Sequence, residues 1–380
     1  MRIAIVTESF PPDVNGVAHS VLRTAEHLLT RGHEPLVIAP APAGGRRRSV
    51  ERHPYPVVRI PSLPLPRYQG FRLGVPAAGL ADALLGHQPH VVHLASPFIL
   101  GGAGATLATR HGLPTVAVYQ TDVAAYARAY RVGWGEAAAW RRLREIHNSA
   151  QRTLAPSTRA AADLIANGVQ RIWLWRRGVD ADRFHPTRRS ESLRRTLAPG
   201  GELLVGYVGR LAPEKRVELL AAAARLPNVR IVVAGDGPDR RQLERALPGV
   251  RFLGVQQGAA LARLYASLDV FVHTGPHETF GQTLQEAAAS GVPVVAPASG
   301  GPVDLVESGV TGLLVPPGDA DALAAAVAEL AADPARRDAY GRAAREAVSR
   351  RSWSAVGDEL IGHYHAVVAG MPAAGLAAHG

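Results

Sequence analysis

The chain has 380 residues, a length that suggests two domains, each with a sizeable core. Hydrophobic residues make up 47% of the sequence and charged residues 19%, a composition that excludes an intrinsically disordered protein. Cysteine is absent, which excludes structural disulfides and thiolate metal sites and agrees with a reducing, cytoplasmic environment.

The formal net charge of +10 is distributed unevenly along the chain. Residues 1–180 contain 21 arginines and 11 acidic side chains, whereas residues 181–380 contain equal numbers of basic and acidic side chains. A basic first half indicates an anionic partner, such as an acidic lipid surface, a phosphorylated substrate or nucleic acid. A coding bias toward arginine is the alternative explanation. Lys215 is the only lysine beside 41 arginines, which hints that this position requires a compact ammonium.

The sequence predicts neither a transmembrane helix nor a signal peptide. No run of about 18 apolar residues occurs anywhere in the chain. The apolar run Ile3–Val6 near the start is too short for a signal peptide and is soon followed by Glu8. We therefore expect a cytoplasmic location.

Short β-branched runs alternate with helical stretches in the first half of the chain. Arg2–Val6 predicts a buried strand, and Ser20–Thr30 predicts an amphipathic helix that Gly32 closes. Further strands are expected at Pro35–Ala39, His90–Leu94 and Pro114–Val118. This alternation is typical of a parallel sheet with helices on both faces.

The alternation restarts in the second half. A helix is expected at Val217–Ala224. Strands are expected at Leu203–Val208, Arg230–Ala234, Arg251–Leu253, Val270–His273 and Val292–Ala296. The fold class is therefore α/β, with two Rossmann-like, doubly wound domains that face a cleft.

We expect the first domain at residues 1–180 and the second at residues 181–354, with a hinge at Val179–Pro186. The last helix, 355–370, has no strand after it and can return to the first domain. The tail beyond it is expected to be a frayed end. Ligands bind beyond the carboxyl ends of the strands in such folds, so functional residues are expected directly after strands.

The loop Gly209–Lys215 follows one of these strands and carries Arg210 and Lys215. Two cations at this spacing, next to a helix start, can converge on two adjacent phosphates. An ordinary solvated loop is the alternative reading of the spacing alone.

Two carboxylates follow another strand, in the segment His277–Glu286. Glu278 is expected on the loop, and Glu286 in the second turn of a helix that starts near Phe280 or Gly281. Carboxylates accept hydrogen bonds from vicinal hydroxyls, and the free N–H groups of a helix start bind phosphate. A helix cap and a surface glutamate are the alternative.

Two further segments follow strands of the first domain. Gly16 opens a helix after the first strand, where the backbone can approach a phosphate closely. The segment Tyr119–Asp122 follows the strand Pro114–Val118. His93 either lines the cleft or is a buried, hydrogen-bonded histidine. No G-x-G-x-x-G follows any strand, which counts against a dinucleotide site.

In their order along the chain these motifs resemble family four of the retaining GT-B glycosyltransferases. The resemblance rests on E-x-F-G-x-x-x-x-E at Glu278–Glu286, G-R-L-x-x-E-K at Gly209–Lys215, and GVDADRF, GGP and GVTGLLV. It implies that Arg210 and Lys215 bind a diphosphate, that Glu278 holds the donor sugar, and that Glu286 holds the ribose. It also implies donor contacts from Gly16, Gln256, Phe280, Gly281, Gln282 and Thr283, with Val255 near the base.

Many relatives have a histidine where Gln120 stands, so the usual histidine role does not carry over to this chain. Asp122 is the ionisable neighbour, and we expect it to be catalytic together with Arg210, Lys215 and Glu278. The resemblance implies that Asn15, Tyr119, Gln120 and His93 lie near the acceptor or the cleft. The strings YQTD and NGV are similar to a narrower group, the bacterial GDP-mannose-dependent mannosyltransferases that build membrane glycolipids. This similarity implies mannose transfer to a lipid-linked acceptor, such as a glycosyl diacylglycerol or a phosphatidylinositol mannoside. A UDP-sugar donor, as in sulfolipid synthases, is the alternative.

Two D-x-D strings, Asp180–Asp182 and Asp319–Asp321, could hold a metal, but helix capping and turn chemistry explain them as well. We expect no metal and no cofactor beyond the nucleotide sugar. A segment that mixes arginine with aromatic residues includes Arg46–Arg48, Arg59 and Arg72. It predicts contact with an anionic membrane on its cytoplasmic face, with a solvated connection as the alternative.

Two other classes of function fit parts of the sequence. An NAD-dependent oxidoreductase would also have Rossmann domains, but it lacks support from any glycine fingerprint. A nucleic-acid-binding protein would agree with the sequence pI near 10.5, but no nucleic-acid motif is recognisable, and we expect no such partner.

Overall fold

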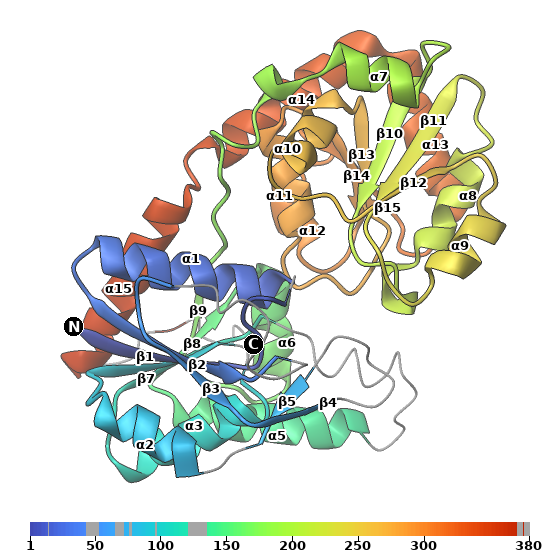
Figure 1. The fold of residues 1–380 in the computed structure, drawn as a ribbon. Helices are drawn as coiled ribbons and strands as arrows, with labels where there is room; N and C mark the ends of the chain where they lie inside the picture. The colour runs from blue at the N-terminus through green and yellow to red at the C-terminus, as the bar shows by residue number, and fades with distance from the viewer. Residues whose placement is uncertain are drawn as a thin grey trace. The chain divides into compact units, whose positions relative to one another are not determined.

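The computed structural model describes residues 1–13, 15–42, 53–64, 72–75, 78–95, 97–120, 135–370 and 375. The chain divides into two units (Figure 1). The first contains Met1–Arg177 and Trp353–Gly380, and the second contains Gly178–Ser352. Each unit is described by itself below.

The first unit is built on a parallel sheet of seven strands in the order β3-β2-β1-β6-β7-β8-β9. The winding direction reverses between β1 and β6, which are hydrogen-bonded neighbours. A separate antiparallel pair is formed by β4 (Ser62–Pro64) and β5 (Arg72–Gly74). The parallel strands are β1 (Arg2–Thr7), β2 (Glu34–Pro40), β3 (Val57–Ile60), β6 (Val91–Ala95), β7 (Thr115–Val118), β8 (Arg152–Ala155) and β9 (Ile172–Leu174).

Helices cover both faces of this sheet because its strands are apolar on both sides. Ile3 and Ile5 belong to one core with α1 and α15, while Ala4 and Val6 belong to another with α2 and α3. The helices are α1 (Gly16–Thr30), α2 (Ala78–Gly86), α3 (Leu100–Arg110), α5 (Gly135–Ser149), α6 (Thr158–Ala166) and α15 (Trp353–Val368).

The C-terminal helix α15 lies beside α1 in the first unit (Figure 1). Asp358 on α15 contacts His27 at 2.8 Å and Arg31 at 2.5 Å, both on α1. The indole N–H of Trp175 donates to the carbonyl oxygen of Val356 at 3.0 Å. These contacts and the shared apolar core attach the end of the chain to its beginning.

The second unit has a parallel sheet of six strands in the order β12-β11-β10-β13-β14-β15. Its winding direction reverses between β10 and β13. The strands are β10 (Leu203–Val208), β11 (Val229–Ala234), β12 (Arg251–Gly254), β13 (Val270–Val272), β14 (Val294–Pro297) and β15 (Gly312–Val315).

The helices of the second unit surround this sheet (Figure 1). Three of the helical turns, Pro186–Arg188, Pro213–Lys215 and Val217–Leu219, are 3₁₀. The α-helices are α7 (Glu191–Leu197), α8 (Leu220–Ala223), α9 (Arg240–Ala246), α10 (Gly258–Ser267), α11 (Gln282–Ala289), α12 (Pro302–Leu305), α13 (Ala320–Ala332) and α14 (Pro334–Ser349).

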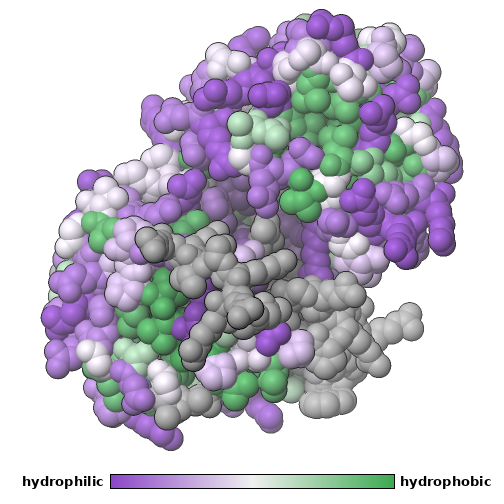
Figure 2. Space-filling view, viewed as in Figure 1, coloured by the Kyte–Doolittle hydropathy of each residue, from purple (hydrophilic) through white to green (hydrophobic). Residues whose placement is uncertain are grey.

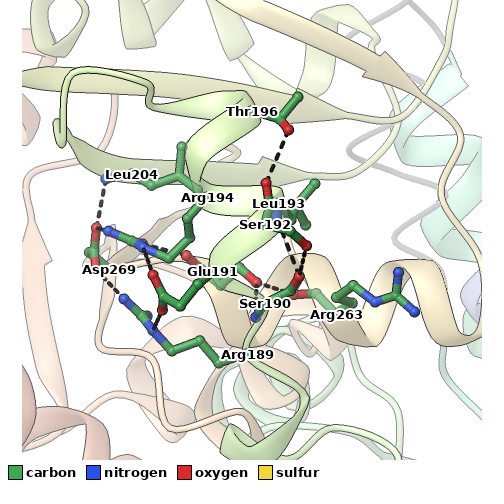
Figure 3. A network of polar contacts seen from close by, with 11 residues as sticks. Arg189, Ser190, Glu191, Ser192, Leu193, Arg194, Thr196, Leu204, Arg263 and Asp269 are labelled. Carbon is green, nitrogen blue, oxygen red and sulfur yellow. Dashed lines mark hydrogen bonds and ion pairs between the residues drawn. The ribbon is translucent and has the colours of Figure 1, made fainter.

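A polar network fixes α7 to the amino ends of two central strands (Figure 3). Asp269, just before β13, pairs with Arg194 of α7 at 2.9 Å and accepts from the amide of Leu204 in β10 at 2.8 Å. Arg194 also donates to the carbonyl oxygen of Ser267 at 2.6 Å. This network therefore lies at the edge of the sheet opposite to the carboxyl-end loops. Arg194 stabilises the packing of α7 against that edge.

Two Rossmann-like, doubly wound sheets are confirmed, and the nine expected strands are present with bounds that differ by at most two residues. The helix expected at Val217–Ala224 is instead a 3₁₀ turn followed by the single turn α8. The short strands β3, β4, β5, β8, β9 and β15 were not expected. None of the described helices combines the length and apolar content needed to cross a membrane.

Candidate functional site

The first cluster of polar side chains lies where the winding of the second sheet reverses. Lys215 follows β10 and Glu278 follows β13, the two strands that flank this reversal. Loops at the carboxyl ends of strands part on either side of such a point, which makes it the usual ligand site of open α/β sheets. The strand order thus brings together two residues that the sequence places far apart.

The ammonium of Lys215 and the carboxylate of Glu278 form an ion pair with an Nζ–Oε2 distance of 2.8 Å. Both side chains are mostly buried, with 18% and 20% of their surface exposed. Burial disfavours the charge on Lys215, but Glu278 and the Tyr207 hydroxyl outweigh it and raise the Lys215 pKa above its usual value. Lys215 is therefore a permanent cation.

His273, the residue directly after β13, contributes a neutral ring to this cluster. Its Nε2 lies 4.0 Å from Oε2 of Glu278, and its side chain is 3% exposed. Burial lowers the His273 pKa to about 4, so the imidazole is uncharged at neutral pH. This histidine was not among the expected site residues, although it ends a predicted strand.

The loop that carries Arg210 is held by backbone contacts to the loop after β11. The amide of Leu211 donates to the carbonyl oxygen of Asp236 at 3.0 Å. A Cβ at Gly235 would lie 1.8 Å from the carbonyl oxygen of Gly209, and one at Gly237 would lie 2.2 Å from that of Leu211. These two glycines are required by the close approach of the loops, a role the sequence analysis missed.

Arg210 and Lys215 are each fixed through their backbone. The hydroxyl of Tyr207 donates to the carbonyl oxygen of Arg210 at 3.1 Å, and that of Thr274 donates to the carbonyl oxygen of Lys215 at 2.6 Å. The charge of Arg210 also acts on Asp239, whose pKa burial raises and Arg210 lowers in part. The loop therefore holds its two cations on a rigid backbone.

The Glu278 loop is held from the other side by the segment Gly300–Pro302. The amide of Gly301 donates to the carbonyl oxygen of Glu278 at 2.7 Å. A Cβ at Gly300 would lie 2.4 Å from that same oxygen, and one at Gly301 would lie 2.1 Å from the carbonyl oxygen of Phe280. The G-G-P string thus has a steric reason, because only glycine permits this backbone contact.

Glu286 lies in the second turn of α11 and is buried. Burial raises the Glu286 pKa to about 7, and the neighbouring Tyr265, Arg183 and Gln282 side chains offset only part of this effect. Arg183 belongs to the hinge string GVDADRF and was not among the expected site residues. A carboxylate that is near its titration point can accept hydrogen bonds from a diol.

The start of α11 supplies backbone N–H groups rather than an apolar side chain. Gly281 has φ 104° at the N-cap, a conformation that favours glycine. The first amides of a helix have no intrahelical acceptor, so those of Gln282 and Thr283 are available donors. Phe280 is a core residue with 1% of its side chain exposed, and its expected donor contact stays a prediction.

Gln256 and Val255 lie at the end of β12, which β11 separates from β10. The side-chain amide of Gln256 donates to the carbonyl oxygen of Leu253 at 2.8 Å, and Val255 is 54% exposed. Their expected contact with the base stays a prediction.

The second cluster lies in the first unit, at the start of α1 and the end of β7. Helix α1 begins at Gly16, as expected. Asn15 is its N-cap: its side-chain oxygen accepts from the amides of Val17 at 3.0 Å and Ala18 at 2.9 Å, and its side-chain nitrogen donates to the Ser9 hydroxyl at 2.8 Å. Asn15 therefore shapes the loop itself.

Gln120 is buried after β7, and its side-chain oxygen accepts a hydrogen bond from Arg177 at 2.8 Å. Arg177 is itself only 6% exposed and was not among the expected site residues. Asp122 lies outside the described residues, so its expected role stays a prediction.

Two residues expected near the acceptor belong to the core of the first unit. His93 is 1% exposed and contacts the Tyr364 hydroxyl of α15 at 2.6 Å through Nδ1, so it is the buried, hydrogen-bonded histidine and not a cleft residue. Burial lowers the His93 pKa to about 3. Tyr119 is 2% exposed and stacks on Trp140 with ring centroids 6.3 Å apart. Both side chains are therefore part of the core of the first unit.

The D-x-D strings serve as caps. Asp180 accepts from the amide of Arg183 at 3.0 Å, and Asp319 accepts from that of Ala322 at 2.9 Å as the N-cap of α13. In the part of the chain that the structure describes, no three histidine, aspartate or glutamate side chains are grouped as metal ligands would be.

Two arginines of the basic segment are engaged with the protein itself. Arg59 donates to the carbonyl oxygens of Pro40 and Pro11 and lies over the ring of Phe10. Arg72 donates to Ala41 and Ser62. Arg46–Arg48 lie outside the described residues. Arg59 and Arg72 are thus bound to carbonyl oxygens of the protein and are not the residues on which the expected membrane contact depends.

Both halves of the chain match known family models, and the matches extend to whole proteins. Residues 14–183 match Glycosyltransferase Family 4, and residues 188–347 match the glycosyl transferases group 1. The chain is 50% identical over 369 residues to the "GDP-mannose-dependent alpha-mannosyltransferase" of Mycobacterium tuberculosis, covering 97% of each. It is 52% identical over 373 residues to the protein of the same name from Mycolicibacterium smegmatis, covering 97% of this chain and 98% of that one.

A solved structure shares the fold. Sucrose-phosphate synthase from Thermosynechococcus elongatus superposes with a TM-score of 0.81 at 24% identity, covering 97% of this chain and 99% of that one. The two matched halves, the relatives that share at least half of its residues, and this common fold show that the chain belongs to the GT-B glycosyltransferases of family four.

Proposed function

We propose that the enzyme transfers mannose from GDP-mannose to a hydroxyl group of a lipid-linked acceptor and retains the anomeric configuration. The donor rests on the two relatives named as GDP-mannose-dependent, which match this chain over 97% of its length. The single structural observation that carries transfer chemistry is the Lys215–Glu278 ion pair at the reversal point of the second sheet.

This pair supplies two opposite functions at one place. Lys215, together with Arg210, binds the diphosphate and stabilises the charge that develops as the sugar departs. The Glu278 carboxylate, which is paired with Lys215, accepts hydrogen bonds from the sugar hydroxyls. In the free enzyme the two groups neutralise each other, which keeps the cation in place until an anionic donor arrives.

The remaining donor contacts come from α11. The N–H groups of Gln282 and Thr283 face the phosphates, and Glu286 accepts from the ribose diol. Glu286 is already buried in the free enzyme, so binding of the diol removes little further water from its carboxylate.

The transfer step is a same-face substitution. The bond between the anomeric carbon and the phosphate oxygen breaks, and the acceptor oxygen bonds to that carbon on the same face. The departing phosphate oxygen takes the acceptor proton, so atoms and charge balance without a protein nucleophile. Analysis of the product linkage by NMR tests this step, and a β-linked product would contradict it.

The reaction needs no metal in this proposal. Arg210 and Lys215 supply the positive charge that a divalent ion would supply elsewhere, and Asp180 and Asp319 are used as caps. We expect full activity in excess EDTA, with magnesium-supplemented enzyme as the control.

A lipid-linked acceptor places the enzyme at the cytoplasmic face of the plasma membrane as a peripheral protein. Figure 2 shows hydrophobic side chains at several places on the displayed face, set among hydrophilic ones. On the β4–β5 pair, Leu63 is 63% exposed, the highest value among the large hydrophobic side chains in the described ranges. Leu63→Asp should weaken binding to anionic vesicles, and Val255→Asp in the second unit is the matched control.

A thermal-shift panel with GDP, UDP and ADP and their sugars identifies the donor. Stabilisation by GDP and GDP-mannose alone supports the proposal. Stabilisation only by a UDP-sugar would replace the donor and leave the family intact, and tight binding of NAD without any nucleotide sugar would overturn the reaction class.

A further inference from the structure

The buried Arg177, the glycine at position 16 and Gln120 form a cluster that the reaction scheme above does not use. We propose that Arg177 is a positioning residue that fixes Gln120 as a hydrogen-bond donor to a sugar oxygen, and that position 16 is glycine to make room for it. This inference rests on the proposed function.

The location of the cluster is that of a ligand site. Gly16 follows β1 and Gln120 follows β7. In the first sheet β6 lies between these two strands, and the winding direction reverses between β1 and β6. Arg177 follows β9, at the same carboxyl edge. The first unit thus repeats the arrangement of the second, with polar side chains gathered where ligands bind in open α/β sheets.

The hydrogen bond between Arg177 and Gln120 fixes the orientation of the Gln120 side-chain amide. A guanidinium only donates, so the partner of its Nη2 at 2.8 Å is the oxygen Oε1 of Gln120. The amide nitrogen Nε2 is then turned away from Arg177 and presents N–H groups only. Since both side chains are 6% exposed, this orientation is held in a site of low dielectric.

Such a glutamine recognises an oxygen acceptor, and it carries no charge. A histidine at position 120 would place an ionisable ring beside a permanent cation, which would disfavour its protonated form. A neutral donor that is fixed by a buried arginine therefore suits a hydroxyl or ring oxygen of a sugar. That sugar belongs either to the donor or to the acceptor.

Gly16 is explained by space and not by backbone conformation. It does not have a positive φ, so an alanine could adopt its backbone geometry. A Cβ there would lie 2.6 Å from Nη1 of Arg177, well inside a normal contact distance. Alanine at position 16 would therefore push the guanidinium away from Gln120.

A double-mutant cycle in thermal stability tests the geometry independently of catalysis. Gly16→Ala should lower the melting temperature of the wild type but change the Arg177→Ala variant by less than half as much. Gly362→Ala, at a helical glycine of the same unit with nothing within 4 Å of a Cβ, is the control. Equal losses in both backgrounds would separate Gly16 from Arg177 and overturn this part.

Steady-state kinetics test the role of Gln120. Gln120→Glu keeps an oxygen for Arg177 and adds an ion pair, so it should fold, but it has no N–H to donate. We expect kcat/KM to fall by about 10-fold to 100-fold. A rise in KM for GDP-mannose places the contact on the donor sugar, and a rise in KM for the acceptor places it on the acceptor sugar.

Wild-type activity in Gln120→Glu would overturn the donor role, because a purely structural glutamine survives this substitution. Stabilisation by GDP should be unchanged in Gln120→Glu, since GDP carries no sugar for this side chain to contact. If the wild-type enzyme transferred no mannose, the proposed function would fail, whereas the stability cycle would still report on the Gly16–Arg177 contact.

Discussion

The ammonium of Lys215 and the carboxylate of Glu278 lie 2.8 Å apart although 63 positions separate them in the sequence. Each is attached to a loop that a second, glycine-containing loop holds in place: the β11 loop on one side and Gly300–Pro302 on the other. The site is therefore rigid at the level of the backbone, and its one lysine is preorganised by a carboxylate rather than by the substrate.

Lys215→Ala should lower kcat by about 100-fold to 1,000-fold, because it removes a preorganised charge from the departing diphosphate. Lys215→Arg should also lose most activity, since Lys215 is mostly buried against Glu278 and a planar guanidinium fork differs in shape from a compact ammonium. The exposed Arg225→Ala in the same unit is the control. A near-normal turnover in Lys215→Ala would remove this residue from the reaction.

Gly301→Ala should reduce both stability and activity. Gly301 has φ −62° and ψ −32°, which suit alanine, so the effect comes only from the Cβ that would lie 2.1 Å from the carbonyl oxygen of Phe280. We expect a loss of about 1–3 kcal/mol in the free energy of unfolding, as for other overpacked sites, and a raised KM for the donor. Urea titration measures the first quantity, and an unchanged donor KM would show that Glu278 does not depend on this contact.

The strands and the loops that follow them could be predicted because buried parallel strands are continuous apolar runs and their ends are marked by polar residues. For this reason Lys215 and Glu278 were expected near a ligand. Their ion pair could not be predicted, since it depends on the strand order that makes β10 and β13 neighbours. The strands β8 and β9 are short and carry Arg152 or Trp173, so the periodicity of the sequence does not reveal them.

Residues that act across the sheet were the ones that sequence reasoning missed. Arg177 contacts a partner 57 positions away, and nothing in the string RGVD indicates a buried arginine. His93, in contrast, was expected in the cleft but is buried. The helix α15 packs over it, and the Tyr364 hydroxyl of that helix contacts its ring. A contact with the last helix of the chain is invisible from the local pattern.

Tyr364→Phe tests the structural role of His93. The substitution removes the hydroxyl that lies 2.6 Å from Nδ1 of a fully buried ring and leaves that nitrogen without this partner. We expect a loss of about 1–3 kcal/mol in the free energy of unfolding, with kcat changed less than twofold. Chemical denaturation and initial rates measure the two quantities. A large loss of kcat at unchanged stability would return His93 to the acceptor site.

Glu286 should make the stability of the free enzyme depend on pH. Burial raises its pKa from 4.5 to about 7 in the folded protein, so the folded state binds the proton more tightly than the unfolded state does. Its contribution is fully present below pH 4.5 and is lost as the pH rises through 7, by about 3 kcal/mol at most. Glu286→Gln should therefore be more stable than the wild type at pH 8 and should lack this part of the pH dependence.

The same titration should act on nucleotide affinity in the opposite direction. The ionised carboxylate accepts hydrogen bonds from both ribose hydroxyls, so binding of the nucleotide favours the charged form and lowers the Glu286 pKa. We expect the affinity for GDP to fall as the pH drops below 7, and 2′-deoxy-GDP, which lacks one hydroxyl, to show a smaller fall. Calorimetric titrations between pH 5.5 and pH 8 measure both ligands. An equal pH dependence for the two would show that Glu286 does not hold the ribose diol.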